Sequence, residues 1–227
     1  MSNHKILPLM QQEHHLNQIN HIHYISQAPH TDNILAACDA GCQWIQLRIK
    51  EGTTASIQKV AEAAKQICDR YQATLIINDH PHIAVTVGAQ GVHVGKLDMT
   101  VAAARAIAGN KMIIGGTANT LTDILQHAQD GADYVGVGPY RFTNTKQNLS
   151  PILGLSGYQH MMQALKEKNI SIPVIAIGGI LPEDIPALVE AGIHGIAASG
   201  MITQATDKTQ LIRNLYEQFN LNATWSH

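Results

Sequence analysis

Short apolar runs alternate along the chain with segments in which apolar residues recur at every third or fourth position. The alternation begins near residue 21 and continues to about residue 219. Several of the short runs are apolar at nearly every position, which is typical of parallel strands that are buried on both faces. These runs predict eight strands, at residues 22–26, 44–49, 74–79, 91–95, 112–117, 134–139, 173–179 and 195–200.

Helical periodicity fills the intervals between the runs. It is clearest over residues 56–71, where Ile57, Ala61, Ala64 and Cys68 share one helix face. The segment at 82–87 is the weakest, because it is short and rich in β-branched residues. The remaining helices are predicted at residues 32–40, 100–108, 121–129, 157–168, 183–191 and 207–219.

Repeated strand–helix units of about 25 residues, without a linker between them, predict an α/β fold of one domain. Two architectures fit: a closed (β/α)8 TIM barrel and an open doubly wound sheet. The number of strands and their regular spacing favour the barrel. We therefore divide the chain into a His-rich leader (1–20), a TIM-barrel domain (21–220) and a C-terminal tail (221–227).

Composition and charge indicate the cellular compartment and the kinds of binding partner to expect. Of the 227 residues, 45% are hydrophobic, and the formal net charge is -2, so a large core can form and broad attraction to nucleic acid or membrane is not indicated. The leader has no apolar stretch of signal-peptide length, and the odd number of cysteines, three, favours a reducing compartment. We therefore expect a cytoplasmic protein. Cys38 and Cys42 are interpreted as packing residues, with a zinc site as the less favoured alternative.

Polar residues follow the predicted strands at their carboxyl ends, where all the loops of a barrel's active site meet. Gln46, Arg48 and Lys50 alternate along one face of the second strand, while Ile45 and Leu47 form its packing face. Two cations and an amide pointing into a barrel mouth are costly to bury unless they meet an anion. A solvated strand end is the alternative.

Two carboxylates stand at neighbouring strand ends. Asp79 follows Asn78 at the end of the third strand, and Asp98 follows the fourth. Each could be a helix N-cap, because a helical segment comes directly after it. Together with Arg48 and Lys50, however, they favour a Mg²⁺ site that also receives substrate phosphate.

A second group of anion-binding residues follows strands six to eight. Hydroxyl and ammonium donors occur in the loop RFTNTK, and glycine backbone N–H groups occur at two helix starts. No pairing of a nucleophile with a base is visible, which indicates chemistry driven by electrostatic help to a leaving group. The residues concerned are Thr143, Thr145, Lys146, Gly178, Gly179, Ser199 and Gly200.

The series QLRIK, IINDH, GVHVGKLDM, GADYVGVGPYRFTNTK, IPVIAIGGI and GIHGIAASGMI resembles the thiamine-phosphate synthase family over about residues 21–218. The resemblance implies a (β/α)8 barrel that uses Mg²⁺. It implies condensation of 4-amino-2-methyl-5-hydroxymethylpyrimidine diphosphate with 4-methyl-5-(2-hydroxyethyl)thiazole phosphate, which gives thiamine monophosphate and diphosphate. In such a reaction the diphosphate departs first, and the thiazole nitrogen captures the pyrimidine carbocation.

The resemblance also implies roles for individual residues. Asp79 and Asp98 would hold Mg²⁺, and His93 would lie near the pyrimidine, with a core histidine as the alternative. The pyrimidine diphosphate would contact Gln46, Arg48, Lys50, Asn78 and Lys146, and Arg48, Lys50, Lys146 and Thr117 would carry the chemistry. The thiazole phosphate would contact Thr143, Thr145, Gly178, Gly179, Ser199 and Gly200.

The sequence departs from the family pattern at several positions. Thr117 stands where a serine is usual, Asn119 where a histidine is usual, and Lys96 where a glutamine is common. Two alternatives therefore remain: a thiazole tautomerase with the same barrel, and a non-catalytic binder of thiamine precursors. The expected partners are small-molecule substrates, and a homodimer is an open expectation for which no residue pattern defines a face.

Overall fold

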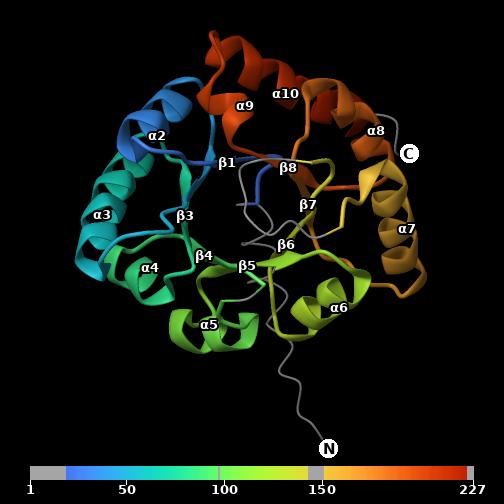
Figure 1. Ribbon diagram of the computed structural model, residues 1–227, viewed down its shortest axis with the longest axis horizontal. Coiled ribbons are helices and arrows are strands. Elements are labelled where there is room, and N and C mark those ends of the chain that lie inside the picture. Colours follow the sequence, from blue (N-terminus) through green and yellow to red (C-terminus); the bar gives the residue numbers. More distant parts are fainter. Residues whose placement is uncertain (1–18, 97, 143–150, 224–227) are drawn as a thin grey trace, which may run out of the picture.

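The protein is a closed barrel of eight parallel strands surrounded by helices (Figure 1). The computed structural model describes residues 19–96, 98–142 and 151–223. The strands pair in chain order, and β8 returns to pair with β1. They are β1 (Ile22–Ile25), β2 (Trp44–Leu47), β3 (Thr74–Asn78), β4 (Gly91–Val94), β5 (Ile113–Ala118), β6 (Tyr134–Val137), β7 (Val174–Ile177) and β8 (Gly195–Ala198).

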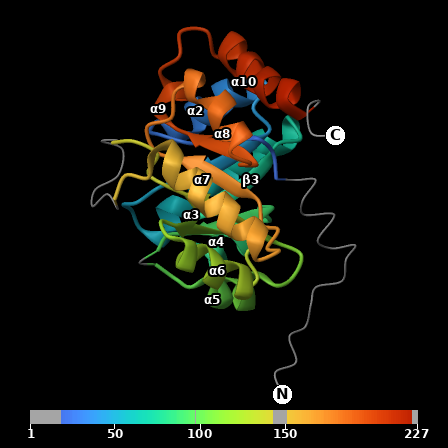
Figure 2. The same ribbon diagram turned by 90° about the vertical axis from the view of Figure 1, so that its right-hand side faces the viewer.

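Helices follow the strands and cover the outside of the barrel, as the view turned by 90° also shows (Figure 2). Among the described residues, no helix has both the length and the apolar character needed to cross a bilayer. The helices are α2 (His30–Asp39), α3 (Thr54–Arg70), α4 (Pro81–Val87), α5 (Val101–Ala108), α6 (Leu121–Gln129), α7 (Gly154–Glu167), α8 (Ile185–Glu190), α9 (Gly200–Thr203) and α10 (Lys208–Ala223), with a 3₁₀ turn η1 (Pro182–Asp184) before α8.

The apolar residues form two layers because side chains alternate along each strand. One cluster lies between the strands and the helices and includes Ile45 and Leu47 of β2. A smaller cluster fills the barrel interior and includes Trp44, Ile76 and Tyr134. Gln46 shares the parity of Trp44, so the packing face predicted for the second strand is confirmed and Gln46 lies on the opposite face, whereas Arg48 and Lys50 follow the end of β2.

The prediction of a (β/α)8 barrel is confirmed, including the weakly indicated helix at 82–87, which is α4. Pro81 starts that helix, and Gly88 ends it with a φ of 69°. The sequence did not predict α9, because a segment of four residues is too short to show a helical period, and the single helix predicted at 183–191 is divided into η1 and α8. Cys38 and Cys42 are buried free thiols of the outer core, as the packing interpretation holds.

Arg105 of α5 and Asp133, just before β6, form a nearly buried ion pair. Their Nη2 and Oδ2 atoms lie 2.6 Å apart, and the side chains are 13% and 8% exposed. The same carboxylate oxygen accepts the Ile114 backbone N–H at 2.7 Å. Asp133 therefore joins a helix to two neighbouring strands.

Replacing Asp133 with alanine is expected to lower the free energy of unfolding by about 3 kcal/mol, because Arg105 would be left buried without its counter-charge. Urea denaturation measures this change. Asp69→Ala is the control, since Asp69 is 55% exposed in its pair with Lys65 and should cost no more than about 1 kcal/mol. Equal losses in the two variants would contradict the assignment of Arg105–Asp133 as a structural pair.

Candidate active site

Four polar side chains occupy the last inward-facing positions of β2, β3, β4 and β5. They are Gln46, Asn78, His93 and Thr117. Asn78 pairs with His93 in the strand register, and His93 pairs with Gly115 on β5, which places these positions at similar depth in the barrel. Gln46, Asn78 and His93 are buried. The structure thus places these four residues, to which the family resemblance gives roles, on the inner faces of neighbouring strand ends.

His93 is held at both ring nitrogens. Its Nδ1 lies 3.0 Å from the Tyr134 hydroxyl, and its Nε2 lies 3.0 Å from Thr117 Oγ1. Thr117 is partly exposed at the barrel mouth. His93 is therefore a buried histidine whose hydrogen bonds reach the surface of the site.

Lys50 lies between two carboxylates. Its Nζ forms an ion pair with Asp79 and lies 3.8 Å from Asp98 Oδ2. The other Asp79 oxygen, Oδ1, accepts the Gly95 backbone N–H at 3.0 Å. Burial alone would raise the pKa of Asp79, but the Lys50 ammonium and the Gly95 N–H hold this pKa below its ordinary value. Asp79 is thus an ionised, fixed anion at the rim.

Neither aspartate caps a helix. The residue before α4 is His80, which makes no side-chain cap, and α5 is capped by Thr100, whose Oγ1 accepts the Ala103 N–H at 3.2 Å. Asp79 has a φ of 62°, a conformation that side-chain-bearing residues rarely adopt. Backbone strain of this kind often accompanies function, and here it directs the Asp79 carboxylate toward Lys50.

The carboxylate cluster fits a magnesium ion. Gly95 lacks a side chain at the point where the two carboxylates meet: a Cβ there would overlap Asp98 Oδ2 and stand 3.5 Å from Asp79 Oδ1. The described residues contain no group of three or more His, Cys, Asp or Glu placed to hold a metal. A donor set of two carboxylates matches Mg²⁺, which completes its shell with water and phosphate oxygens.

The loops after β6 and β7 are tied to each other. The Arg141 guanidinium donates to Gly179 O at 2.7 Å and makes two hydrogen bonds to Asp184, at 2.6 and 2.8 Å. The Arg141 backbone N–H donates to Gly178 O at 2.9 Å. Burial opposes ionisation of Asp184, but Arg141 and the Leu181 N–H hold the pKa of this carboxyl below its ordinary value.

The backbone conformation and close contacts at positions 178 and 179 favour glycine. The φ angles of Gly178 and Gly179 are 95° and 68°, and a Cβ on Gly179 would lie 2.5 Å from Arg141 Cγ and 2.9 Å from Phe142 O. The backbone after β7 therefore faces the loop after β6 without side chains between them. Ser199 and Gly200 begin α9 after β8, and Ser199 Oγ donates to Ile25 O at 2.8 Å.

Three predicted site residues, Thr143, Thr145 and Lys146, lie outside the described residues. Arg48 directly follows β2 and is half-buried, and its backbone N–H donates to Ser26 Oγ at 3.3 Å. Lys96, which stands where a glutamine is common in the family, forms an ion pair with Asp123 at 2.8 Å. Although burial opposes it, this lysine holds the pKa of Asp123 at about 2.

Sequence reasoning gave no role to Tyr134 or Arg141. Tyr134 looked like an ordinary apolar strand position, although its hydroxyl reaches His93. Arg141 belongs to the quoted loop RFTNTK, but only the fold brings it to Asp184. Asn119, noted as a departure, donates from Nδ2 to Gly138 O and so holds the end of β5 against the end of β6.

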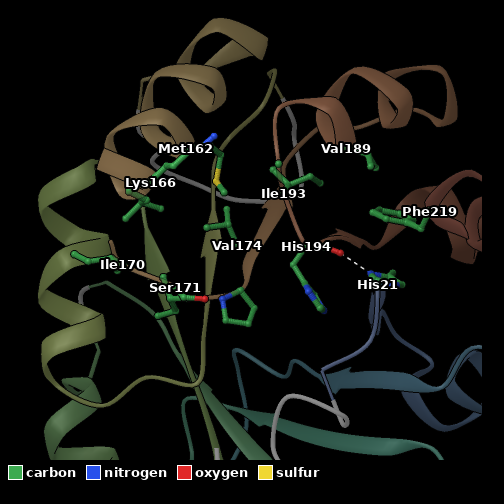
Figure 3. A pocket seen from close by; sticks show the side chains of 14 residues that line it. His21, Met162, Lys166, Ile170, Ser171, Val174, Val189, Ile193, His194 and Phe219 are labelled. Carbon is green, nitrogen blue, oxygen red and sulfur yellow. Dashed lines mark hydrogen bonds between the residues drawn. The ribbon is translucent and has the colours of Figure 1, made fainter. Parts of the chain in front are cut away.

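Cavities occur at both ends of the barrel in the described part of the chain. One of about 510 Å³ lies at the carboxyl end of the strands and is lined by Lys96, Asn119, Leu121 and residues at the start of α7. Another of about 560 Å³ lies at the amino ends of β7 and β8 and is mainly apolar (Figure 3). There the His21 ring stacks on Phe219 at 4.9 Å and hydrogen-bonds His194 O at 2.6 Å. This second cavity lies at the opposite end from the polar rim.

The sequence model of the family described as "Thiamine monophosphate synthase" matches residues 19–202. The chain belongs to this family. A thiamine-phosphate synthase of Flavobacterium johnsoniae is 49% identical over 207 residues, which cover 89% of this chain and 98% of that protein. One of Bacteroides thetaiotaomicron is 47% identical over 193 residues, covering 85% and 92%.

The fold agrees with the family assignment. The structure of thiamine phosphate pyrophosphorylase from Pyrococcus furiosus superposes with a TM-score of 0.79 at 27% identity, and the match covers 91% of this chain and 98% of that one. The resemblance that the sequence motifs indicated is thus confirmed for the thiamine monophosphate synthase family. The roles of individual residues stay predictions.

Proposed function

We propose that the rim built by Lys50, Asp79 and Asp98 is where this enzyme binds the pyrimidine diphosphate with Mg²⁺. As a thiamine-phosphate synthase, the enzyme joins this substrate to the thiazole phosphate and releases diphosphate. The observation that carries the proposal is the convergence of two carboxylates and one ammonium beside Gly95, where no side chain intervenes. It supports a site for a charged leaving group.

Asp79 and Asp98 would hold Mg²⁺, which would neutralise part of the diphosphate charge. Lys50 and Arg48 come from the same strand end and would contact phosphate oxygens, Lys50 as a point charge and Arg48 through its planar fork. Lys146 would add a third cation from the loop after β6. These groups lower the barrier by stabilising the departing diphosphate, without a proton transfer.

Gln46, Asn78, His93 and Thr117 would receive the pyrimidine ring beside this cluster. The hydrogen bonds of His93 to Tyr134 and Thr117 fix its ring before the substrate arrives, which reduces the reorganisation needed in the reaction. The buried position of Gln46 and His93 also keeps water away from the carbon that becomes cationic once diphosphate leaves.

The glycine loop after β7 would bind the thiazole phosphate. Gly178 and Gly179 would offer their backbone N–H groups, and Arg141 holds this loop through the Gly178 and Gly179 carbonyls against the start of the loop that carries Thr143 and Thr145. Ser199 and Gly200 come from the neighbouring strand end. Barrels commonly bind phosphate between the loops after strands seven and eight, so the thiazole nitrogen would face the pyrimidine across the mouth.

A single assay tests the proposal. The purified protein is mixed with both substrates and Mg²⁺, and thiamine monophosphate is followed with and without a chelator. We expect product that disappears with the chelator and returns with added Mg²⁺. Product formed equally well with the chelator would contradict the metal assignment, and isomerisation of the thiazole phosphate without condensation would favour a tautomerase.

The oligomeric state and the cellular location rest on the sequence alone. We propose a homodimer in the cytoplasm. Sedimentation equilibrium of the purified protein tests the first part, and a mass near that of one 24.6 kDa chain would contradict it.

A further inference from the structure

The Tyr134 hydroxyl lies beneath the proposed pyrimidine site. Tyr134 begins β6, and its side chain points into the barrel and is fully buried. It packs edge-on against Trp44, with ring centroids 5.0 Å apart and an interplanar angle of 72°. The interior layer here also holds the buried His23, which stacks on Trp44 and meets Tyr134 edge-on, and a hydroxyl buried among these rings needs hydrogen-bond partners.

The partners are site residues on two different strands. The hydroxyl lies 3.0 Å from His93 Nδ1 on β4 and also hydrogen-bonds the Gln46 side chain on β2. His93 continues through Nε2 to Thr117 Oγ1 on β5, at 3.0 Å. Four side chains therefore form one continuous chain of hydrogen bonds, and both Gln46 and Thr117 stand at its ends.

The barrel is built to admit this ring. Gly115 on β5 lies against it, and a Cβ on Gly115 would stand 2.5 Å from the Tyr134 hydroxyl oxygen and overlap the ring carbons. On β6, Gly136 lies against His93, and a Cβ on Gly136 would come within 3.3 Å of His93 Cε1. The two glycines leave room for the Tyr134–His93 contact and for little else.

We propose that Tyr134 is a positioning residue that sets the donor and acceptor pattern of the pyrimidine pocket. Through this pattern it gives the pocket its preference for a 4-aminopyrimidine over the corresponding 4-oxopyrimidine. The inference rests on the proposed function, because it takes Gln46, His93 and Thr117 as the residues around the pyrimidine ring.

When His93 is neutral, the hydrogen-bond chain can carry its protons in two ways. A hydroxyl has one hydrogen to donate, and a neutral imidazole donates at one nitrogen and accepts at the other. Burial raises the pKa of Tyr134 well above its ordinary value, so the hydroxyl keeps its proton. If Tyr134 donates to His93, then His93 donates to Thr117; if Tyr134 accepts from His93, then Thr117 donates to His93.

The same choice orients Gln46. In the first arrangement Tyr134 accepts from the Gln46 amide nitrogen, and in the second it donates to the amide oxygen, so a different part of the amide faces the barrel mouth. An aminopyrimidine presents a donor beside a ring-nitrogen acceptor, whereas an oxopyrimidine presents an acceptor in place of the amino donor. Leaving a buried polar group without a matching partner is costly. Each orientation of the Gln46 amide therefore matches only one of the two pyrimidine rings.

Tyr134→Phe tests the inference because it removes the hydroxyl and keeps the ring. Both the 4-amino and the 4-oxo pyrimidine diphosphates are used, with saturating thiazole phosphate and Mg²⁺. We expect kcat/KM for the amino substrate to fall about tenfold or more. The preference for amino over oxo should fall by a similar factor, while the KM for thiazole phosphate stays unchanged.

Tyr158→Phe is the matched control. Tyr158 is also fully buried, and its hydroxyl donates to the Val137 carbonyl, away from the proposed pyrimidine residues. This variant should lower the melting temperature about as much as Tyr134→Phe, but it should leave the amino/oxo preference at the wild-type value. The comparison separates loss of a buried hydrogen bond from loss of positioning.

Two results would overturn the inference: an unchanged amino/oxo preference in Tyr134→Phe, or equal losses for the pyrimidine and thiazole substrates. Gln46→Ala keeps this failure distinct from failure of the proposed site. If Gln46→Ala leaves the pyrimidine kinetics unchanged, the site assignment is wrong. If Gln46→Ala weakens them and Tyr134→Phe does not, only the role of Tyr134 is wrong.

Discussion

Turnover should fall at least about a hundredfold when Asp79 is replaced with asparagine, because one of the two carboxylates proposed to hold Mg²⁺ loses its charge. Asparagine suits this position because it tolerates the left-handed backbone conformation that Asp79 adopts. The substitution therefore removes charge without adding backbone strain. Steady-state kinetics across a range of Mg²⁺ concentrations measures the effect, and the variant should need more metal for half-maximal activity.

The thiazole end of the site provides the internal comparison. Asp79→Asn should leave the binding of thiazole phosphate near the wild-type value, measured by calorimetry without the second substrate. Asp123→Asn is the control variant, because Asp123 pairs with Lys96 and not with Lys50. It should lose some stability at the start of α6 and keep its Mg²⁺ requirement. If Asp79→Asn abolished thiazole phosphate binding too, the division of the rim into two sites would be wrong.

Gly179→Ala is the second change with a large expected effect. Gly179 has a φ of 68°, and the added Cβ would lie 2.9 Å from Phe142 O and 2.5 Å from Arg141 Cγ. The loop must move to relieve these contacts. A displacement of about 1 Å at a phosphate-binding backbone can cost about a hundredfold, so kcat/KM for thiazole phosphate should fall by that order.

Two causes could contribute to the loss in Gly179→Ala: strain from the positive φ and the close contacts of the added Cβ. Gly88→Ala separates them. Gly88 has a φ of 69°, but a Cβ there would meet nothing within 4 Å. It ends α4 at the opposite end of the barrel from the rim, so Gly88→Ala should cost about 1 kcal/mol of stability and leave the kinetics unchanged. Similar kinetic losses in both variants would show that backbone strain, and not the position of Gly179, governs the thiazole site.

The barrel could be predicted from the sequence because its signal is local and repeated. Each strand is a short apolar run, and each long helix shows its own period, so eight independent patterns support one architecture. The residues at the strand ends were also predictable, since alternation along β2 already separates Gln46 from Leu47. Only segments shorter than one or two turns, such as α9, escaped this reasoning.

Contacts between distant loops could not be predicted in the same way. Arg141 and Asp184 are 43 positions apart, and nothing in either local sequence distinguishes their pairing from solvated charges. Lys96 illustrates the same limit, because its ammonium could turn toward Asp98 or toward Asp123, and only the packed structure shows the second. The role of Tyr134 depends on side chains from three other strands, which no single pattern contains.

The short strands of this barrel also limit the ways in which its sequence can change over evolutionary time. β2 has four residues, and its side chains alternate between the interior and the helix layer. One residue inserted between Trp44 and Gln46 would turn the amide outward and place an aliphatic side chain at the barrel mouth. Lineages descending from this enzyme can therefore vary in length in the connections at the amino ends of the strands, away from the proposed site, whereas inside the strands they can diverge only by exchanging one residue for another.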